Sequence, residues 1–136
     1  MNTKKADWIN KPERISMSLH SLSFHSEGRH CVFFTIGESG SITIEIKKGD
    51  ASFVFLHTHN DAIRFSDKGI GIRMFSFSSR IPIAAGRSMR MEKNGEDISF
   101  YSDGNMVLSI SNKAFLSSAS FGAMTDKEGE VGLEVF

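Results

Sequence analysis

The chain has 136 residues, one cysteine and no net charge at pH 7. This length fits one domain with a core large enough to fold without disulfides or metal ions, and the zero net charge gives no bulk attraction to nucleic acids or membranes. The single Cys31 cannot form an intramolecular disulfide, and no apolar run is long enough for a membrane span or a signal peptide, so the sequence predicts a cytoplasmic protein.

The first segment, residues 1–13, lacks the alternation of apolar and polar residues that marks a strand. Its only large apolar side chain is Trp8. The sequence therefore predicts a flexible N-terminal tail over residues 1–13, with Trp8 available to a protein partner, followed by a single β domain over residues 14–136.

Alternation begins after Arg14, and the polar stretch 26–29 then predicts a turn. His25 and His30 bracket this turn and would lie opposite each other if the turn closed a hairpin. They would then bind a metal together or act as a pH-sensitive pair, or they are two solvated surface side chains. Cys31 begins an apolar run and is predicted to be buried and inert.

The next pattern predicts a β-hairpin around Lys48-Gly49. A two-residue loop at this position would pair Ile44 with Phe53 and Ile42 with Phe55, so that apolar residues meet on one face. The run 53–56 is apolar on both faces, which favours a strand that is buried on both sides.

His57-Thr58-His59 follows this run, with Asp61 two residues further on. Residues i and i+2 share one face of a strand, so both imidazoles would reach one metal ion, with Asp61 as a third ligand. Gly49, His57-Thr58-His59 and Gly69 resemble the first motif of the cupins, and the resemblance implies a metal-binding β-barrel. The alternative is that both histidines continue the core face to its rim.

Charge is unevenly distributed along the second half of the chain. Residues 62–95 carry seven basic and two acidic side chains, a net charge of +5, whereas residues 96–136 carry two basic and seven acidic ones, a net charge of −5. This segregation and the tail predict a partner-binding surface. Its expected residues are Trp8, Arg64, Arg73, Arg80, Arg87 and Arg90. Arginine beside Phe65, Phe75 or Phe77 would also stack on single-stranded bases, but these rings are needed in the core, which makes nucleic acid an unlikely partner.

Two turns are predicted near the end of the basic segment. A two-residue Asn94-Gly95 loop would pair Met91 with Ile98 and Met89 with Phe100. A three-residue loop over 103–105 would pair Phe100 with Leu108 and Ile98 with Ile110.

Together these patterns predict an all-β fold: an antiparallel meander of about ten short strands that closes into a two-sheet sandwich or a barrel, jelly-roll-like in form. The chain has no nucleophile-elbow motif and no phosphate-binding glycine loop, so an enzyme is disfavoured. The favoured function is a non-enzymatic binding or assembly module that acts through protein contacts and self-associates, with no cofactor. The alternatives are the metal-binding barrel and a carbohydrate-binding sandwich, for which Trp8 and Tyr101 are the only amphipathic aromatics.

Overall fold

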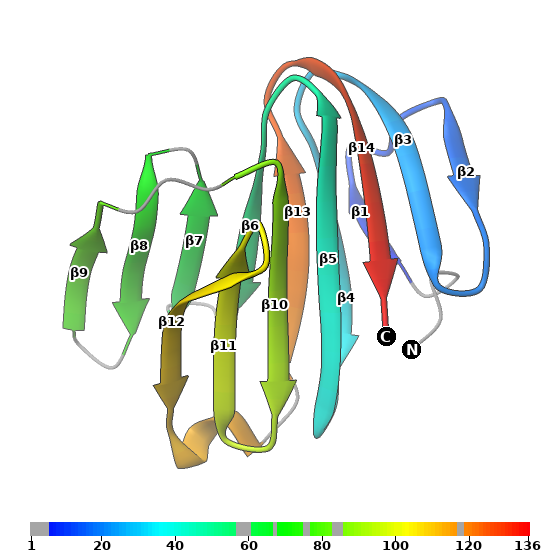
Figure 1. The fold of residues 1–136 in the computed structure, drawn as a ribbon. Coiled ribbons are helices and arrows are strands. Elements are labelled where there is room, and N and C mark those ends of the chain that lie inside the picture. Colours follow the sequence, from blue (N-terminus) through cyan, green and yellow to red (C-terminus); the bar gives the residue numbers. More distant parts are fainter. Residues whose placement is uncertain (1–5, 57–60, 67, 75–76, 83–85, 117–118) are drawn as a thin grey trace.

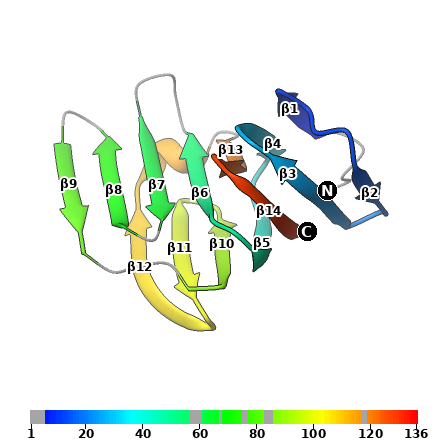
Figure 2. The ribbon, with the colours of Figure 1, turned by 90° about the horizontal axis from the view of Figure 1, so that it is seen from above.

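Two antiparallel seven-stranded sheets pack face to face, and these sheets hold nearly all of the structure (Figure 1). The computed structural model describes residues 6–56, 61–66, 68–74, 77–82, 86–116 and 119–136. Sheet A has the strand order β1-β4-β13-β6-β7-β8-β9, and sheet B has the order β12-β11-β10-β5-β14-β3-β2. Seen from above, the two sheets form separate layers (Figure 2). The sandwich that the sequence predicted, as an alternative to a barrel, is therefore confirmed.

The strands of sheet A are β1 (Asp7–Ile9), β4 (His30–Ile36), β13 (Ala119–Thr125), β6 (Ala51–Leu56), β7 (Ala62–Ser66), β8 (Gly69–Met74) and β9 (Phe77–Ile81). Those of sheet B are β12 (Asn105–Ser111), β11 (Asp97–Ser102), β10 (Ser88–Asn94), β5 (Ser39–Lys48), β14 (Glu128–Val135), β3 (Ser21–Glu27) and β2 (Ile15–Met17). A one-turn 3₁₀ helix, η2 (Lys113–Leu116), follows β12 and buries Phe115.

The core lies between the sheets because apolar residues occupy alternate positions along most strands. Aromatic rings fill its middle, where Phe55 meets Phe115 and Phe121 edge to face at centroid distances of 5.6 and 5.3 Å. Edge-to-face contacts of this kind add to the stabilisation that comes from buried area. The alternation also leaves the opposite side of each sheet facing solvent, which gives the molecule two outer faces.

The turn at Lys48-Gly49 is present, but the hairpin predicted around it is wrong. β5 lies in sheet B and β6 in sheet A, so the turn passes from one layer to the other. Ile44 pairs with Met89 and Leu133. Apolar alternation specifies which face of a strand is buried but not which strand is its hydrogen-bonded neighbour. The predicted partners do line one core, from opposite sheets.

The β10–β11 hairpin is present with a register two residues away from the predicted one. Its loop is Gly95-Glu96, and Met91 pairs with Phe100. A shift by two keeps each side chain on its predicted face, and it also places Glu92 opposite Ser99 rather than opposite Asp97. A tertiary contact supports this register, because the Gly95 N–H donates to the Glu38 carbonyl at 2.8 Å.

The next hairpin confirms the predicted pairs of Phe100 with Leu108 and Ile98 with Ile110. Its loop is nevertheless only two residues long, Asp103-Gly104, since Ser102 pairs with Asn105. A register shift between Phe100 and Tyr101 accommodates the extra residue as a bulge. The register therefore follows the predicted apolar pairs, whereas the loop is one residue shorter than predicted.

Part of the segment expected to be a tail belongs to the sheet. Asp7–Ile9 form β1, which pairs with β4 along the edge of sheet A. The Trp8 ring meets Phe24 edge to face at a centroid distance of 5.3 Å. Trp8 is therefore half-buried against the core.

His25 and His30 do not lie opposite each other, because their strands belong to different sheets. His25 lies across from Glu130 of β14, whereas His30 is buried and accepts a hydrogen bond from the Glu27 N–H at its Nε2, at 3.2 Å. Within the described part of the chain, no helix is long and apolar enough to cross a membrane.

Candidate binding face on sheet A

Three of the predicted partner-binding arginines share the outer face of sheet A. Arg64 of β7, Arg73 of β8 and Arg80 of β9 occupy the strand positions between inward-facing apolar residues such as Ile63 and Ile72. Strand alternation therefore forces all three guanidinium groups into solvent. We call the outer surface of β7, β8 and β9 the basic face.

A groove crosses the basic face because one strand position there has no side chain. Gly71 pairs with Arg64 on one side and with Arg80 on the other, so no side chain separates these two arginines. A Cβ added at Gly71 would meet nothing within 4 Å. The groove has a volume of about 380 Å³. Its lining consists of Asp50, Ala51, Ser52, Arg64, Ser66, Lys68, Gly69, Gly71, Arg80, Met124, Asp126 and Lys127.

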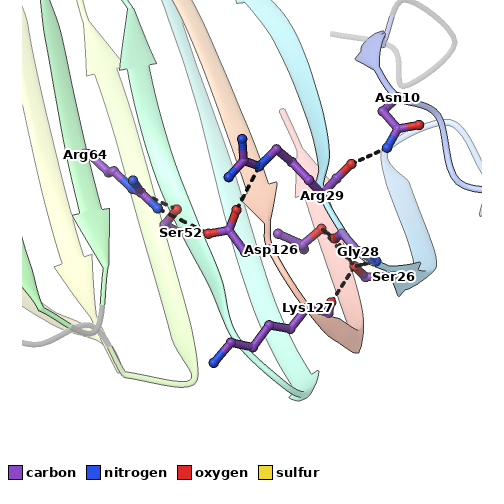
Figure 3. Close-up of polar contacts among 9 residues, drawn as sticks. Asn10, Ser26, Gly28, Arg29, Ser52, Arg64, Asp126 and Lys127 are labelled. Atoms are coloured by element: carbon purple, nitrogen blue, oxygen red, sulfur yellow. Dashed lines mark hydrogen bonds and ion pairs between the residues drawn. The ribbon is translucent and has the colours of Figure 1, made fainter.

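Arg64 is held at one wall of this groove by two polar neighbours (Figure 3). Its Nε donates to Ser52 Oγ at 3.3 Å, and its Nη2 lies 3.7 Å from Asp126 Oδ2. Asp126 also accepts a hydrogen bond from Arg29 Nε at 3.3 Å. One carboxylate is thus shared by two guanidinium groups, which leaves Arg64 oriented but only partly neutralised.

Asp126 is positioned by a buried polar cluster beneath it. The Ser26 hydroxyl is fully buried and lies 2.9 Å from Thr125 Oγ1, 2.9 Å from the Gly28 carbonyl and 2.7 Å from the Lys127 carbonyl. These contacts tie the β3–β4 turn to the β13–β14 turn. Because Arg29 and Asp126 lie in these two turns, the cluster holds their side chains next to each other (Figure 3).

The opposite wall of the groove includes Lys68 and Arg80, and neither forms an ion pair within the described residues. The Arg80 Nη2 donates to the Lys68 carbonyl at 3.3 Å. Among the residues that the structure describes, Arg73 and Arg80 form no ion pair. Neither β7, β8 nor β9 carries an acidic residue within its bounds. Among the described residues, the basic face therefore exposes the positive charges of Arg73 and Arg80 without an ion-pair partner.

The other predicted partner residues lie elsewhere. Trp8 faces the core, and Arg87 donates from its Nη1 to the Gly49 carbonyl at 2.7 Å. Arg90 lies on the outer face of sheet B, with its guanidinium 4.2 Å above the Tyr101 ring and its Nε 3.0 Å from Glu92 Oε1. The predicted set therefore does not form one surface, and only Arg64, Arg73 and Arg80 belong together.

The predicted metal site lies mostly outside the described residues. His57 and His59 are not among them, and Asp61 is half-buried just before β7. In the described segments, no three His, Cys, Asp or Glu side chains converge in a way that would hold a metal ion. The metal site stays a prediction of the sequence.

Sequence analysis did not identify several residues of the groove, namely Ser52, Lys68, Gly71, Asp126 and Lys127. Lys68 and Gly71 lie within the basic segment. Because Gly71 lies between Ile70 and Ile72, the strand alternation could have predicted that this position faces outward. Asp126 and Lys127 come from a turn far along the chain. No local pattern places that turn beside β6 and β7, because their proximity follows from the pairing of β13 with β6.

No protein-family model matches the chain, and no curated protein matches its sequence. Solved structures do share its fold. A functionally unknown protein from Saccharomyces cerevisiae is 14% identical with a TM-score of 0.62, and the match covers 98% of this chain and 95% of that chain.

The SPRY domain of human HERC1 is 11% identical with a TM-score of 0.59, over 98% of this chain and 95% of that chain. The carbohydrate binding module CBM66 from Bacillus subtilis is 15% identical with a TM-score of 0.51, over 94% of this chain and 92% of that chain. These likenesses establish the fold alone.

Proposed function

We propose that this protein is a non-enzymatic binding module that contacts an acidic surface of a protein partner through the basic face. One observation carries the proposal: Arg64, Gly71 and Arg80 lie side by side on three paired strands, with no acidic residue within those strands. Guanidinium groups bind carboxylates with two parallel hydrogen bonds, so a row of them recognises a carboxylate-bearing surface.

The molecule already contains one contact between a carboxylate and arginine side chains. Asp126 contacts both Arg64 and Arg29 at the end of the groove, and a partner carboxylate would make the same kind of contact with Arg73 and Arg80. Side chains on paired strands are held at fixed spacing, which limits the entropy lost on binding.

A protein partner is favoured over a carbohydrate because the amphipathic aromatic rings are covered. Sugar-binding sites commonly present an open aromatic ring on which the apolar face of a sugar packs. Here Trp8 packs against Phe24, and the Arg90 guanidinium lies above Tyr101. Neither ring offers a free platform.

The proposal is tested by the binding of fluorescein-labelled hexaglutamate, measured by fluorescence anisotropy at low salt. In the Arg73→Gln, Arg80→Gln double variant we expect the affinity to fall at least tenfold, since one charge-assisted hydrogen bond contributes about 1.5 kcal/mol. The matched control is Arg14→Gln, Lys113→Gln, which removes two exposed cations away from the basic face. Equal losses in both double variants would show that the peptide responds only to total charge.

The shape of the groove is tested separately by Gly71→Val. The new side chain fills the space between Arg64 and Arg80 without changing any charge, and β-branched residues suit strands. We expect unchanged stability together with weaker hexaglutamate binding. Unchanged binding would place the contact outside the groove.

A further inference from the structure

The outer face of sheet B has the opposite electrical character to the basic face. Strand alternation places an excess of carboxylates there, with seven acidic and three basic side chains and hence a net charge of −4. The acidic members are Glu27, Glu45, Glu92, Asp97, Glu128, Glu130 and Glu134, and the basic members are Lys47, Lys48 and Arg90. We call this surface the acidic face.

Two carboxylates of the acidic face stand at a hollow. Glu45 and Glu134 line a depression of about 340 Å³ over β2, β3, β14 and β5. Gly132 lies between Ser23 and Glu45 in the strand register, so the depression, like the groove of the basic face, lies over a position without a side chain. Lys47 also lines the depression, with the end of its side chain over Gly132, but among the described residues neither Glu45 nor Glu134 forms an ion pair.

We infer that the acidic surface recognised by the basic face is the acidic face of a second copy of this chain. This inference rests on the proposed function and names the partner. Charge complementarity supports it, because Arg73 and Arg80 of one face form no ion pair among the described residues and the other face carries an excess of carboxylates. The whole chain has no net charge, so copies that approach one another experience no overall repulsion.

The geometry of the sandwich decides what kind of assembly follows. The two faces are the outer surfaces of opposite sheets and point in opposite directions (Figure 2). Two copies therefore cannot satisfy both faces of both molecules in a closed dimer. Each contact is head to tail, and it leaves one basic and one acidic face free for the next copy. The expected product is a chain of molecules that grows with concentration.

Sedimentation velocity over a concentration series tests the inference. At about 0.02 M salt, where charges interact over roughly 20 Å, we expect the weight-average sedimentation coefficient to rise with concentration beyond the value for a dimer. At about 0.5 M salt, where screening is strong, we expect a monomer. A plateau at the dimer, or a monomer in both salts, would overturn the inference.

Charge reversal on each face identifies the contact. Arg73→Glu, Arg80→Glu changes the basic face, and Glu45→Lys, Glu134→Lys changes the acidic face. Each double variant should remain monomeric at low salt, whereas the control Glu96→Lys, Lys113→Glu should assemble like the wild type, since it reverses two exposed charges outside the facing strands. Assembly that persists in either face variant would contradict the inference.

Hexaglutamate binding separates the two proposals. The Glu45→Lys, Glu134→Lys variant keeps its basic face, so it should bind the peptide at least as tightly as the wild type does while it fails to assemble. A wild-type protein that binds the peptide but stays monomeric overturns only the self-assembly. A wild-type protein that assembles but does not bind the peptide removes the basic face from both proposals.

Discussion

In both sheets of this sandwich, side chains alternate between the core and the outer face. The outward side chains of the two sheets differ in charge. On β7, β8 and β9 the outward positions hold arginine, serine, glycine and alanine, whereas on β14 they hold three glutamates and Gly132. The inward positions of both sheets are mostly apolar, and Ser26, Lys93 and Thr125 are buried polar exceptions. The core thus determines that the chain folds into two layers, and the outward residues are free to give each layer its own charge.

Glycine has different roles within the basic face, and this difference gives the largest expected effect on stability. Gly69 has a φ of +117°, and a Cβ there would lie 2.4 Å from the Ile81 carbonyl oxygen. We expect Gly69→Ala to lower the free energy of unfolding by about 2–3 kcal/mol, because strained backbone and a steric clash add together. Urea denaturation measures this change.

The control for Gly69 comes from one glycine on each face. A Cβ at Gly71 meets nothing within 4 Å, and a Cβ at Gly132 meets only the end of the Lys47 side chain, at 3.8 Å. Gly71→Ala and Gly132→Ala should therefore change the free energy of unfolding by less than about 0.5 kcal/mol. A Gly69→Ala variant as stable as these two would show that its backbone is not strained.

The polar cluster under Asp126 gives an intermediate effect. Ser26→Ala removes a fully buried hydroxyl and leaves the Lys127 carbonyl without that partner. We expect a loss of about 1–2 kcal/mol of unfolding free energy, together with weaker hexaglutamate binding because Asp126 and Arg29 lose their fixed turns. The matched variant Ser16→Ala removes an exposed hydroxyl from sheet B and should be neutral in both measurements. Lost stability with unchanged binding would separate the cluster from the binding face.

The smallest effect concerns Cys31 of β4, whose thiol is buried. Burial raises the pKa of the Cys31 thiol from 9.0 to about 11, while the nearby Arg64 opposes the rise. A pKa that is higher in the folded state favours the neutral thiol there, so this stabilisation is complete below pH 9 and is lost as the pH rises through 11.

The titration of this thiol should lower the unfolding free energy of the wild type by about 1 kcal/mol at pH 10. It is measured as the difference in unfolding free energy between pH 8 and pH 10, with Cys31→Ala as the reference that lacks the thiol. Equal pH dependence in the two proteins would show that the thiol titrates normally in the folded state.

Much of the fold follows from the sequence, and the largest part that does not follow is the assignment of strands to the two sheets. Alternation predicted which side of β5, β10 and β11 is buried, and apolar pairing correctly matched Phe100 with Leu108. It failed at Lys48-Gly49 because residues that face the same core from opposite sheets have the same alternation as residues on paired strands. Nothing local separates a hairpin from a turn between layers.

The binding face was predictable in part for the same reason. Arg64, Arg73 and Arg80 alternate with apolar residues, so their exposure could be read from the sequence. Arg90 alternates in the same way and is exposed on the other sheet, because the chain changes layers between β9 and β10. The positions of Asp126 and Lys127 depend on strand pairing across the sheet, which the sequence alone did not supply.

The most direct test of the account is a titration of ¹⁵N-labelled protein with unlabelled hexaglutamate, followed by two-dimensional NMR at about 0.15 M salt, where screening limits long-range effects to roughly 8 Å. The account predicts that the largest shifts fall on the backbone amides of Arg64, Gly71 and Arg80 in sheet A. It predicts smaller shifts for the amides of Glu45 and Glu134 in sheet B, which change only as the peptide displaces a second copy of the chain. Shifts spread evenly over both faces, or largest in sheet B, would contradict it.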